Sequence, residues 1–254
     1  MNTQHIELPA PVLAKIRNLA TRHRNASGVG ITVINALGGQ AESWLGRLPG
    51  PVRIGLDGAT RSALVQASKA AHVSRGAVPD QPGWVNTAVG AAMGAAGGIG
   101  GTATALAELP VTVTLLMRII QGVAAEYDFD PAEESVQFDC LTVFASAGPL
   151  DQDDGAETAF ISARLALNGA ALQKVLAAVS PKLAGALGQK LAAQAVPILG
   201  AAAGAAINFA YTGYYREMAH VQFGLRKLSV DTGINEHALL RALQKELTGP
   251  DVQS

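Results

Sequence analysis

The sequence predicts an all-α protein, a single bundle of about eight to ten helices in which glycine-lined helices pack closely. Apolar residues recur at helical spacing along nearly all of its 254 residues, with little period-two alternation. Two long stretches, Gln81–Ala107 and Leu191–Tyr215, carry no charged residue. The segment Gly-Ala-Ala-x-Gly-Ala-Ala occurs once in each, as Gly90–Ala96 and as Gly200–Ala206. Glycine on one helix face lets a second backbone approach closely, so these repeats predict tight helix packing.

The composition excludes several classes of protein. Charged residues make up 15% of the chain and the formal net charge is −1, so the basic surface of a nucleic-acid-binding protein is absent. The single cysteine, Cys140, rules out a disulfide within the chain, and we expect it to be a buried structural thiol. Met1–Pro11 lacks the basic and apolar regions of a secretory signal peptide. We therefore expect a cytoplasmic protein.

The N-terminal third predicts three helices and a linker. Pro9–His23 forms the first helix in this interpretation, and Val29–Leu48 forms the second. Ile54–Val73 is a third, amphipathic helix. Ser74–Gly83 is rich in glycine and proline, which makes it the best linker candidate.

The first uncharged stretch has a glycine seam. Gly90, Gly94, Gly97 and Gly101 follow one another at spacings of four, three and four, which places them along one helical face. With Gly98 and Gly100, which lie off this face, six glycines within one helix cost about 5 kcal/mol relative to alanine. Either close packing recovers this free energy, or Gly97–Gly101 forms a turn between two helices.

Leu109–Phe129 has the clearest helical pattern. Proline at position 110 fits its first turn, or else bends a longer helix that begins before Glu108. Its polar face carries Thr114, Arg118 and Gln121. Its apolar face consists of Leu116, Ile119, Ile120, Val123 and Tyr127.

Capping patterns predict the helices that follow. In Asp130-Pro131-x-Glu133, Asp130 is placed as the N-cap of a helix running to Ala147. A similar pattern at Asp154–Glu157 predicts a helix to Val179, and Pro181 begins another that ends before Pro197.

The helix beginning at Pro197 is long, and its apolar residues repeat with strict four-three spacing. Asn235 begins a last amphipathic helix. The seam of the long helix consists of Gly200, Gly204, Ile207, Tyr211, Tyr214, Met218, Val221, Leu225 and Leu228.

Known catalytic and metal-binding motifs are absent from the sequence. The five histidines are scattered, without the spacing of metal ligands, and each is interpreted as a surface or ordinary structural histidine. Asp151–Glu157 resembles a calcium loop, but its glycine and final acid fall at the wrong positions, so helix capping explains it better. We expect no cofactor and no metal, and we favour a non-enzymatic protein.

Three polar residues stand out because their surroundings are apolar. Glu108 and Arg118 border or interrupt apolar runs, and Asn208 lies inside the second uncharged stretch. A helix-end carboxylate, a snorkelling arginine and a buried amide are the simpler, favoured interpretation. The alternative is a polar cluster in an apolar cavity that holds a lipid headgroup or a partner. Both uncharged stretches are long enough to span a bilayer, but their small residues favour a soluble or peripheral helical body.

The run from Gly90 to Leu228 resembles the EcsC protein family. The residues that carry the likeness lie in Ala105–Thr114, Arg118–Pro131, Ala192–Gly200 and Gly204–Thr212. The resemblance implies a bacterial protein associated with membranes, and it transfers no catalytic residue. It divides the chain into a variable N-terminal helical part, 1–53, and an EcsC-like helical domain, 54–254.

Three functions of different classes remain. The leading hypothesis is a non-enzymatic protein at the cytoplasmic face of the inner membrane, acting through lipid or a membrane protein such as a transporter. The alternative is a soluble carrier that holds a lipid or another hydrophobic molecule in an apolar helical cavity. The third is an enzyme that uses Glu108 or Cys140. The sequence does not specify an oligomeric state.

Overall fold

A computed structural model describes residues 8–36, 50–77, 101–145, 172–194 and 200–248. All regular structure in these residues is helical, which confirms the predicted all-α class. The predicted total of eight to ten helices and their glycine lining depend on the whole chain and remain predictions. The helices of the described part are α1 (Ala10–Ala36), α3 (Gly50–Ala77), α5 (Gly101–Glu126), α6 (Glu134–Val143), α8 (Leu172–Gln194), α9 (Gly200–Thr232) and α10 (Glu236–Thr248).

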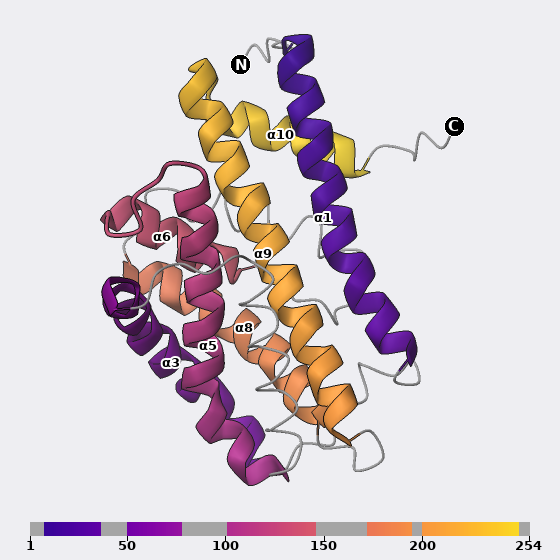
Figure 1. The fold of residues 1–254 in the computed structure, drawn as a ribbon, viewed down its shortest axis with the longest axis vertical. Coiled ribbons are helices and arrows are strands. Elements are labelled where there is room, and N and C mark those ends of the chain that lie inside the picture. Colours follow the sequence, from indigo (N-terminus) through magenta and orange to yellow (C-terminus); the bar gives the residue numbers. More distant parts are fainter. Residues whose placement is uncertain (1–7, 37–49, 78–100, 146–171, 195–199, 249–254) are drawn as a thin grey trace.

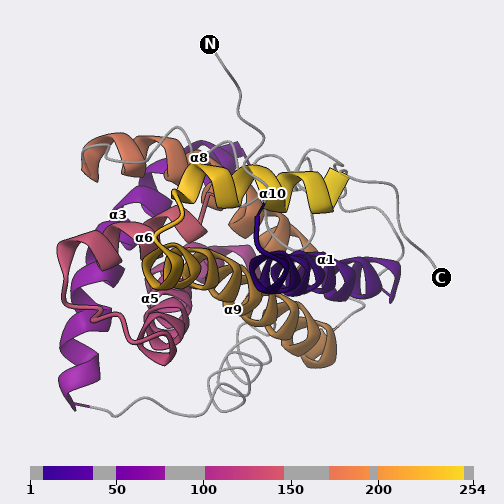
Figure 2. The same ribbon diagram turned by 90° about the horizontal axis from the view of Figure 1, so that it is seen from above.

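The long helix α9 lies at the centre of the bundle. It packs against α1 and α5 on its two sides, as the views along and across the bundle agree (Figures 1 and 2). It also contacts α6, α8 and α10. Helix α3 lies on the far side of α5 and contacts both α5 and α8. The bundle is therefore organised around one helix that most others touch.

The predicted seam of α9 is confirmed wherever its side chains are described. From Ile207 to Leu228, every seam residue is at most 3% exposed. Each large apolar side chain that is fully buried stabilises the fold by about 1.5–3 kcal/mol relative to its exposed state. The four-three spacing thus identified the face of α9 that enters the core, namely Ile207, Tyr211, Tyr214, Met218, Val221, Leu225 and Leu228.

Helix α10 also follows the sequence prediction. The backbone N–H of His237 donates to the Asn235 side-chain oxygen at 2.9 Å, so Asn235 caps the helix. The predicted leucines, Leu239, Leu240, Leu243 and Leu247, are buried. Gly233, with φ +69°, makes the left-handed turn between α9 and α10 that favours glycine.

The first two predicted helices are one helix. Helix α1 continues from Ala10 to Ala36, so the break expected after His23 is wrong. The start of a second helix at Val29 is wrong for the same reason. Gly28 lies in the helix with open space where a side chain would be. A single exposed glycine costs only about 1 kcal/mol in a helix, which the packing of α1 against α9 outweighs. Helix α3 contains the predicted Ile54–Val73 and extends it, so Ser74–Ala77 is helical rather than linker.

Two prolines, Pro110 and Pro181, lie in the interior of described helices. Helix α5 begins at Gly101 and contains Pro110, which matches the longer of the two alternatives for this segment. Helix α8 continues through Pro181, so the predicted helix start at this residue is wrong. Pro181 leaves the carbonyl of Ala177 without its helical donor, but both residues are exposed, so water can hydrate that carbonyl.

The Asp130 motif caps a turn instead of a helix. Its Oδ1 accepts the backbone N–H of Ala132 at 2.8 Å, and the turn precedes α6. Helix α6 begins at Glu134, after Glu133 in an extended conformation, and it ends at Val143. Asp128, with φ 66°, turns the chain immediately after α5. The start predicted for this helix is therefore wrong, because the residues between α5 and α6 form two successive turns. The predicted end is also wrong, since Phe144 and Ala145 form a turn after Val143. The predicted Asp154–Val179 helix begins outside the described residues.

Candidate functional site

The three predicted polar candidates lie on two helices. Glu108 is in α5, but its side chain lies outside the described residues. Arg118 is on the same helix and is partly buried, and Asn208 is buried in α9. Their common site remains a prediction, because the side chain of Glu108 is not described. Gln121, which the sequence places on the polar face of α5, is 1% exposed, so part of that face is buried as well.

A buried lysine that sequence reasoning missed links α8 to α5. Lys190 is only 3% exposed, and its Nζ donates to the Thr112 hydroxyl at 3.2 Å. One turn earlier in α8, the carbonyl of Ala186 accepts a short hydrogen bond from the Tyr211 hydroxyl of α9. Three helices therefore meet at this junction, which we call the lysine junction and define by Thr112, Ala186, Lys190 and Tyr211.

Two of the predicted candidates lie close in sequence to the lysine junction. Glu108 is one turn before Thr112, and Asn208 is one turn before Tyr211. The N-terminal ends of α5 and α9 and the C-terminal end of α8 lie at the same end of the bundle (Figure 1). Polar groups from three helices therefore gather at this end within an apolar interior. A buried charged group such as the ammonium of Lys190 needs them, because it is costly to bury unless it is paired. The sequence signal for Lys190 was its place immediately before the uncharged stretch 191–215.

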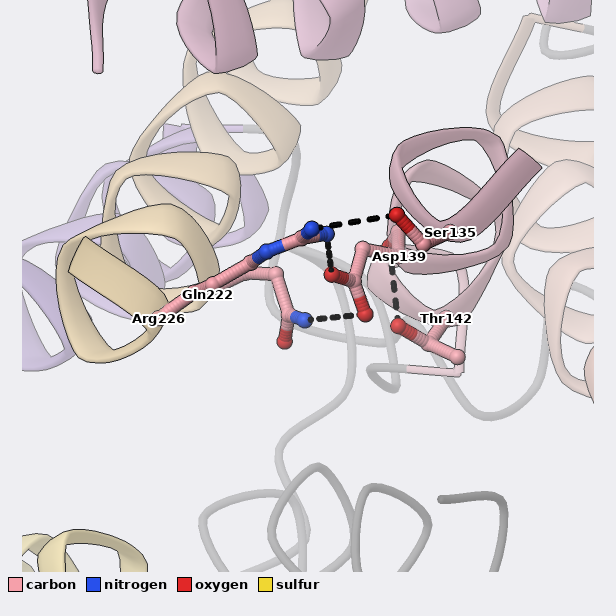
Figure 3. A network of polar contacts seen from close by, with 5 residues as sticks. All are labelled: Ser135, Asp139, Thr142, Gln222 and Arg226. Atoms are coloured by element: carbon pink, nitrogen blue, oxygen red, sulfur yellow. Dashed lines mark hydrogen bonds and ion pairs between the residues drawn. The ribbon is translucent and has the colours of Figure 1, made fainter. Parts of the chain in front are cut away.

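A second polar cluster joins α6 to α9 (Figure 3). The Asp139 carboxylate accepts hydrogen bonds from Arg226 and from Gln222 Nε2, the latter at 3.2 Å. The Arg226 guanidinium also donates to the Ser135 hydroxyl at 3.1 Å and lies 4.5 Å from the centre of the Phe129 ring. Thr142 donates to the backbone carbonyl of Asp139.

The geometry of this α6–α9 cluster is that of a structural clamp. Charge-assisted donors occupy both oxygens of Asp139, which leaves its carboxylate committed to holding α9. Asp139 is one of two charged residues in α6, and unlike Glu134 in the first turn it lies among the buried residues of the helix. Cys140, beside it, is fully buried, in agreement with the structural thiol that the sequence predicts.

Two buried histidines, which the sequence interpretation treated as unrelated, lie on helices that pack together. His23 is on α1 and His220 is on α9. The His220 ring lies edge-on to the Tyr127 ring, with centroids 5.8 Å apart. Burial, together with nearby arginines, lowers the pKa of each histidine to about 4. Within the part of the chain that the structure describes, no group of three or more histidines, cysteines and acids is arranged to hold a metal ion.

The predicted glycine seams lie mostly where side-chain surroundings are not described. Gly90, Gly94 and Gly97 lie outside the described residues. Gly101 and Gly200 are the first residues of α5 and α9, and Gly204 follows within α9. Gly224, which the sequence did not single out, makes a close helix contact: a Cβ built there would lie 2.7 Å from Leu19 Cδ2.

Comparison with known proteins identifies the family. No curated protein and no solved structure matches the chain. Residues 81–228 match the model of the EcsC protein family, which is more than half of the sequence. The matched range includes α5, α6 and α8 and nearly all of α9, whereas α1, α3 and α10 pack around it from outside. The chain belongs to the EcsC protein family.

Proposed function

We propose that this protein is a non-enzymatic helical protein that acts at the cytoplasmic face of a membrane, through lipid or a membrane-protein partner. The apolar character of α5 supports this proposal. Its segment Leu109–Glu126 has a mean hydropathy of 1.3 and is long enough to cross a bilayer, and 56% of it is buried in the bundle. The core helix of a soluble protein can be as long and as apolar as this segment, so the proposal depends on the apolar side chains that remain exposed.

Exposed apolar side chains at one end of the bundle are the observation that carries the proposal. Val111 on α5 is 53% exposed, and Phe209 on α9 is 52% exposed. Helices α5 and α9 run in the same direction (Figure 1), and at the C-terminal end of α5 Glu126 lies 3.8 Å from His220 of α9. Val111 and Phe209 both precede that contact by about 20 Å of helix. They therefore share the end of the bundle that also holds the lysine junction, and large exposed apolar residues favour contact with membranes or partners.

Flotation of the full chain with vesicles tests this proposal. Wild-type protein is mixed with vesicles of phosphatidylcholine, alone or with phosphatidylglycerol, and the fraction that floats is measured. We expect flotation with at least one composition, and its loss in the variant Phe209→Asp, because a charged side chain is costly to place in the apolar layer.

Val230→Asp is the matched control, since Val230 is 66% exposed on the same helix but lies near its opposite end. We expect this variant to float as wild type does. Equal loss in both variants, or wild-type protein that never floats, contradicts direct binding to lipid.

The second candidate function is that of a carrier, and the lysine junction favours it. Lys190 provides a cation within an apolar interior, next to the hydroxyl of Thr112. An amphipathic ligand with an acidic head and an acyl chain matches both properties, because the head pairs with the ammonium group and the chain packs among apolar side chains. Native mass spectrometry with palmitate as the probe separates this function from the first, since it detects a bound acyl chain without any membrane.

A further inference from the structure

Helix α1 lies antiparallel along α9, and two contacts set the register between them. Leu19 of α1 reaches the backbone of Gly224 so closely that a Cβ there would lie 2.7 Å from its Cδ2. About one turn further along α1, Arg22 forms an ion pair with Glu217 at 2.6 Å. The chain thus advances along α1 while it goes back along α9, as Figure 1 shows.

This register brings two histidines to the same place. His23 lies four residues after Leu19, and His220 lies four residues before Gly224. Residues four apart share a helix face. A step of four residues along each helix from the Leu19–Gly224 contact therefore places His23 opposite His220 in the α1–α9 interface. Their side chains are 2% and 5% exposed, respectively. Neither ring nitrogen of His220 has a hydrogen-bond partner, although both are buried.

The charges around the two rings come from four helices. Helix α1 contributes Arg22 and Arg24, and α9 contributes Arg216 and Glu217. The end of α5 contributes Glu126, whose carboxylate lies 3.8 Å from His220, and Tyr127 follows directly after it. Helix α10 contributes Glu246, whose carboxylate pairs with Arg17 and whose backbone carbonyl accepts a hydrogen bond from the Arg24 guanidinium.

Protonation of these rings therefore opposes the packing of α1. Burial is the largest cause that disfavours the charged form of each histidine, and the neighbouring arginines add to it. Glu126 is half exposed, so water screens its attraction for a protonated His220. Two cations opposite each other, beside Arg22 and Arg216, would also repel one another.

We propose that α1 is an acid-sensitive strap, which leaves α9 when His23 and His220 are protonated and thereby uncovers its own apolar face. The structural basis is that the strap lies outside the family-matched residues 81–228, packs on their last helix, and carries both a histidine and an arginine into that interface. The uncovered face of α1 contains Ile16, Leu19 and Ala20, all buried in the docked state. The inference does not rest on the proposed membrane function, because release of α1 is measurable without lipid.

Hydrogen exchange of the full chain at pH 7 and pH 5 tests the strap. Amide protection is corrected for the intrinsic effect of pH and compared between peptides from α1 and from α5. We expect protection within residues 16–26 to fall by at least about tenfold at pH 5 for each histidine that titrates, and to lie well below that of residues 116–124, which exchange only when the whole chain unfolds. Unchanged protection of α1 contradicts the proposal, and so does equal protection of α1 and α5 at pH 5, which would mean that α1 opens only by global unfolding.

Variants attribute the effect to the two rings. In the double variant His23→Phe, His220→Phe, phenyl rings replace the imidazole rings and cannot be protonated. We expect the protection of α1 to become the same at both values of pH. If the double variant fails to fold, the single variant His220→Phe, which keeps a ring against Tyr127, takes its place. It should lose about half of the logarithmic change in α1 protection between pH 7 and pH 5. His237→Phe is the control on α10 and should respond to pH as wild type does. A pH response that persists without the two histidines contradicts the proposal.

Vesicle binding separates this inference from the proposed function. Release of α1 at pH 5 without any increase in flotation leaves the strap standing and removes a membrane role for the uncovered face. Flotation that does not depend on pH, with α1 docked throughout, has the opposite meaning: it supports membrane binding and contradicts the strap as its switch.

Discussion

Asp139 on α6 and Arg226 on α9 form an ion pair that joins two helices across 87 residues of sequence. The side chains are 8% and 20% exposed, so water screens the pair much less than it screens a surface pair. Gln222, Ser135 and Phe129 complete the surroundings of the two charges. This clamp fixes the rotation of α9 about its own axis, because Gln222 and Arg226 lie one turn apart on one face.

Removing the charge of Asp139 should destabilise the fold. In Asp139→Asn the side chain keeps its shape, but Arg226 loses its counter-charge in a partly buried place. We expect the free energy of unfolding to fall by about 2 kcal/mol, measured by urea denaturation.

Asp231→Asn is the control, since Asp231 pairs with Lys227 on the surface of α9. Exposed ion pairs contribute little, so this variant should unfold nearly as wild type does. Equal stability of Asp139→Asn and Asp231→Asn would contradict the clamp.

Gly224→Ala tests the close approach of α1 to α9. Alanine favours helix by about 1 kcal/mol over glycine, but its Cβ would displace the buried side chain of Leu19. At Gly213, on the same helix, a Cβ would meet nothing within 4 Å. We therefore expect the free energy of unfolding, measured in urea, to be higher for Gly213→Ala than for Gly224→Ala, by about 1 kcal/mol or more.

A second substitution checks the cause of this difference. Leu19→Ala removes the side chain that the new Cβ would meet, so the loss from Gly224→Ala should be smaller in the Leu19→Ala background. If the two losses simply add, the crowding argument is wrong.

The stability of the protein should decrease in acid well before its carboxylates are protonated. Folding lowers the pKa of His23 and His220 from 6.5 to about 4, so the unfolded chain binds more protons between these values. The stabilisation from the neutral rings is complete above pH 6.5 and is lost as the pH falls toward 4. We expect a loss of about 2 kcal/mol per histidine at pH 5, and a flatter dependence on pH for His220→Phe. A wild-type stability that is equal at pH 7 and pH 5 would show that neither ring is held neutral.

Lys190→Met tests the carrier. Methionine keeps most of the apolar length of lysine and removes the ammonium group that meets Thr112. If the lysine junction holds an acidic headgroup, the affinity for palmitate should fall at least about tenfold, as measured by native mass spectrometry or calorimetry. Lys174→Met is the control, because Lys174 is exposed on the same helix. Equal affinity in wild type and Lys190→Met would remove the lysine as a ligand-binding residue.

Sequence periodicity predicted those parts of the fold in which one apolar face meets one core. The seam of α9 and the leucines of α10 were predictable, since a face buried along several turns imposes its spacing on the sequence. Helix ends were less predictable. Gly28 and Pro181 are local signals for a break, and each costs a limited free energy that tertiary packing and hydration of exposed backbone offset.

The polar contacts could not be read from the sequence because their partners are distant in the chain. Asp139 and Arg226 become a pair only through the packing of α6 on α9, and His23 meets the level of His220 only through the register of α1. A weaker signal was present in α9: Glu217, His220 and Gly224 repeat at helical spacing and form a second row beside the apolar seam. A row that combines glycine with polar residues is typical of a face on which another helix packs closely.

The distribution of the full-length protein in fractionated cells tests the central claim most directly. Cells that produce the untagged chain are lysed, their membranes are sedimented, and the membranes are then washed with alkaline carbonate. We expect most of the protein to sediment with the membranes and to be released by carbonate, as befits a protein bound at the membrane face. Protein found wholly in the soluble fraction, with no flotation on any vesicle, would contradict the account.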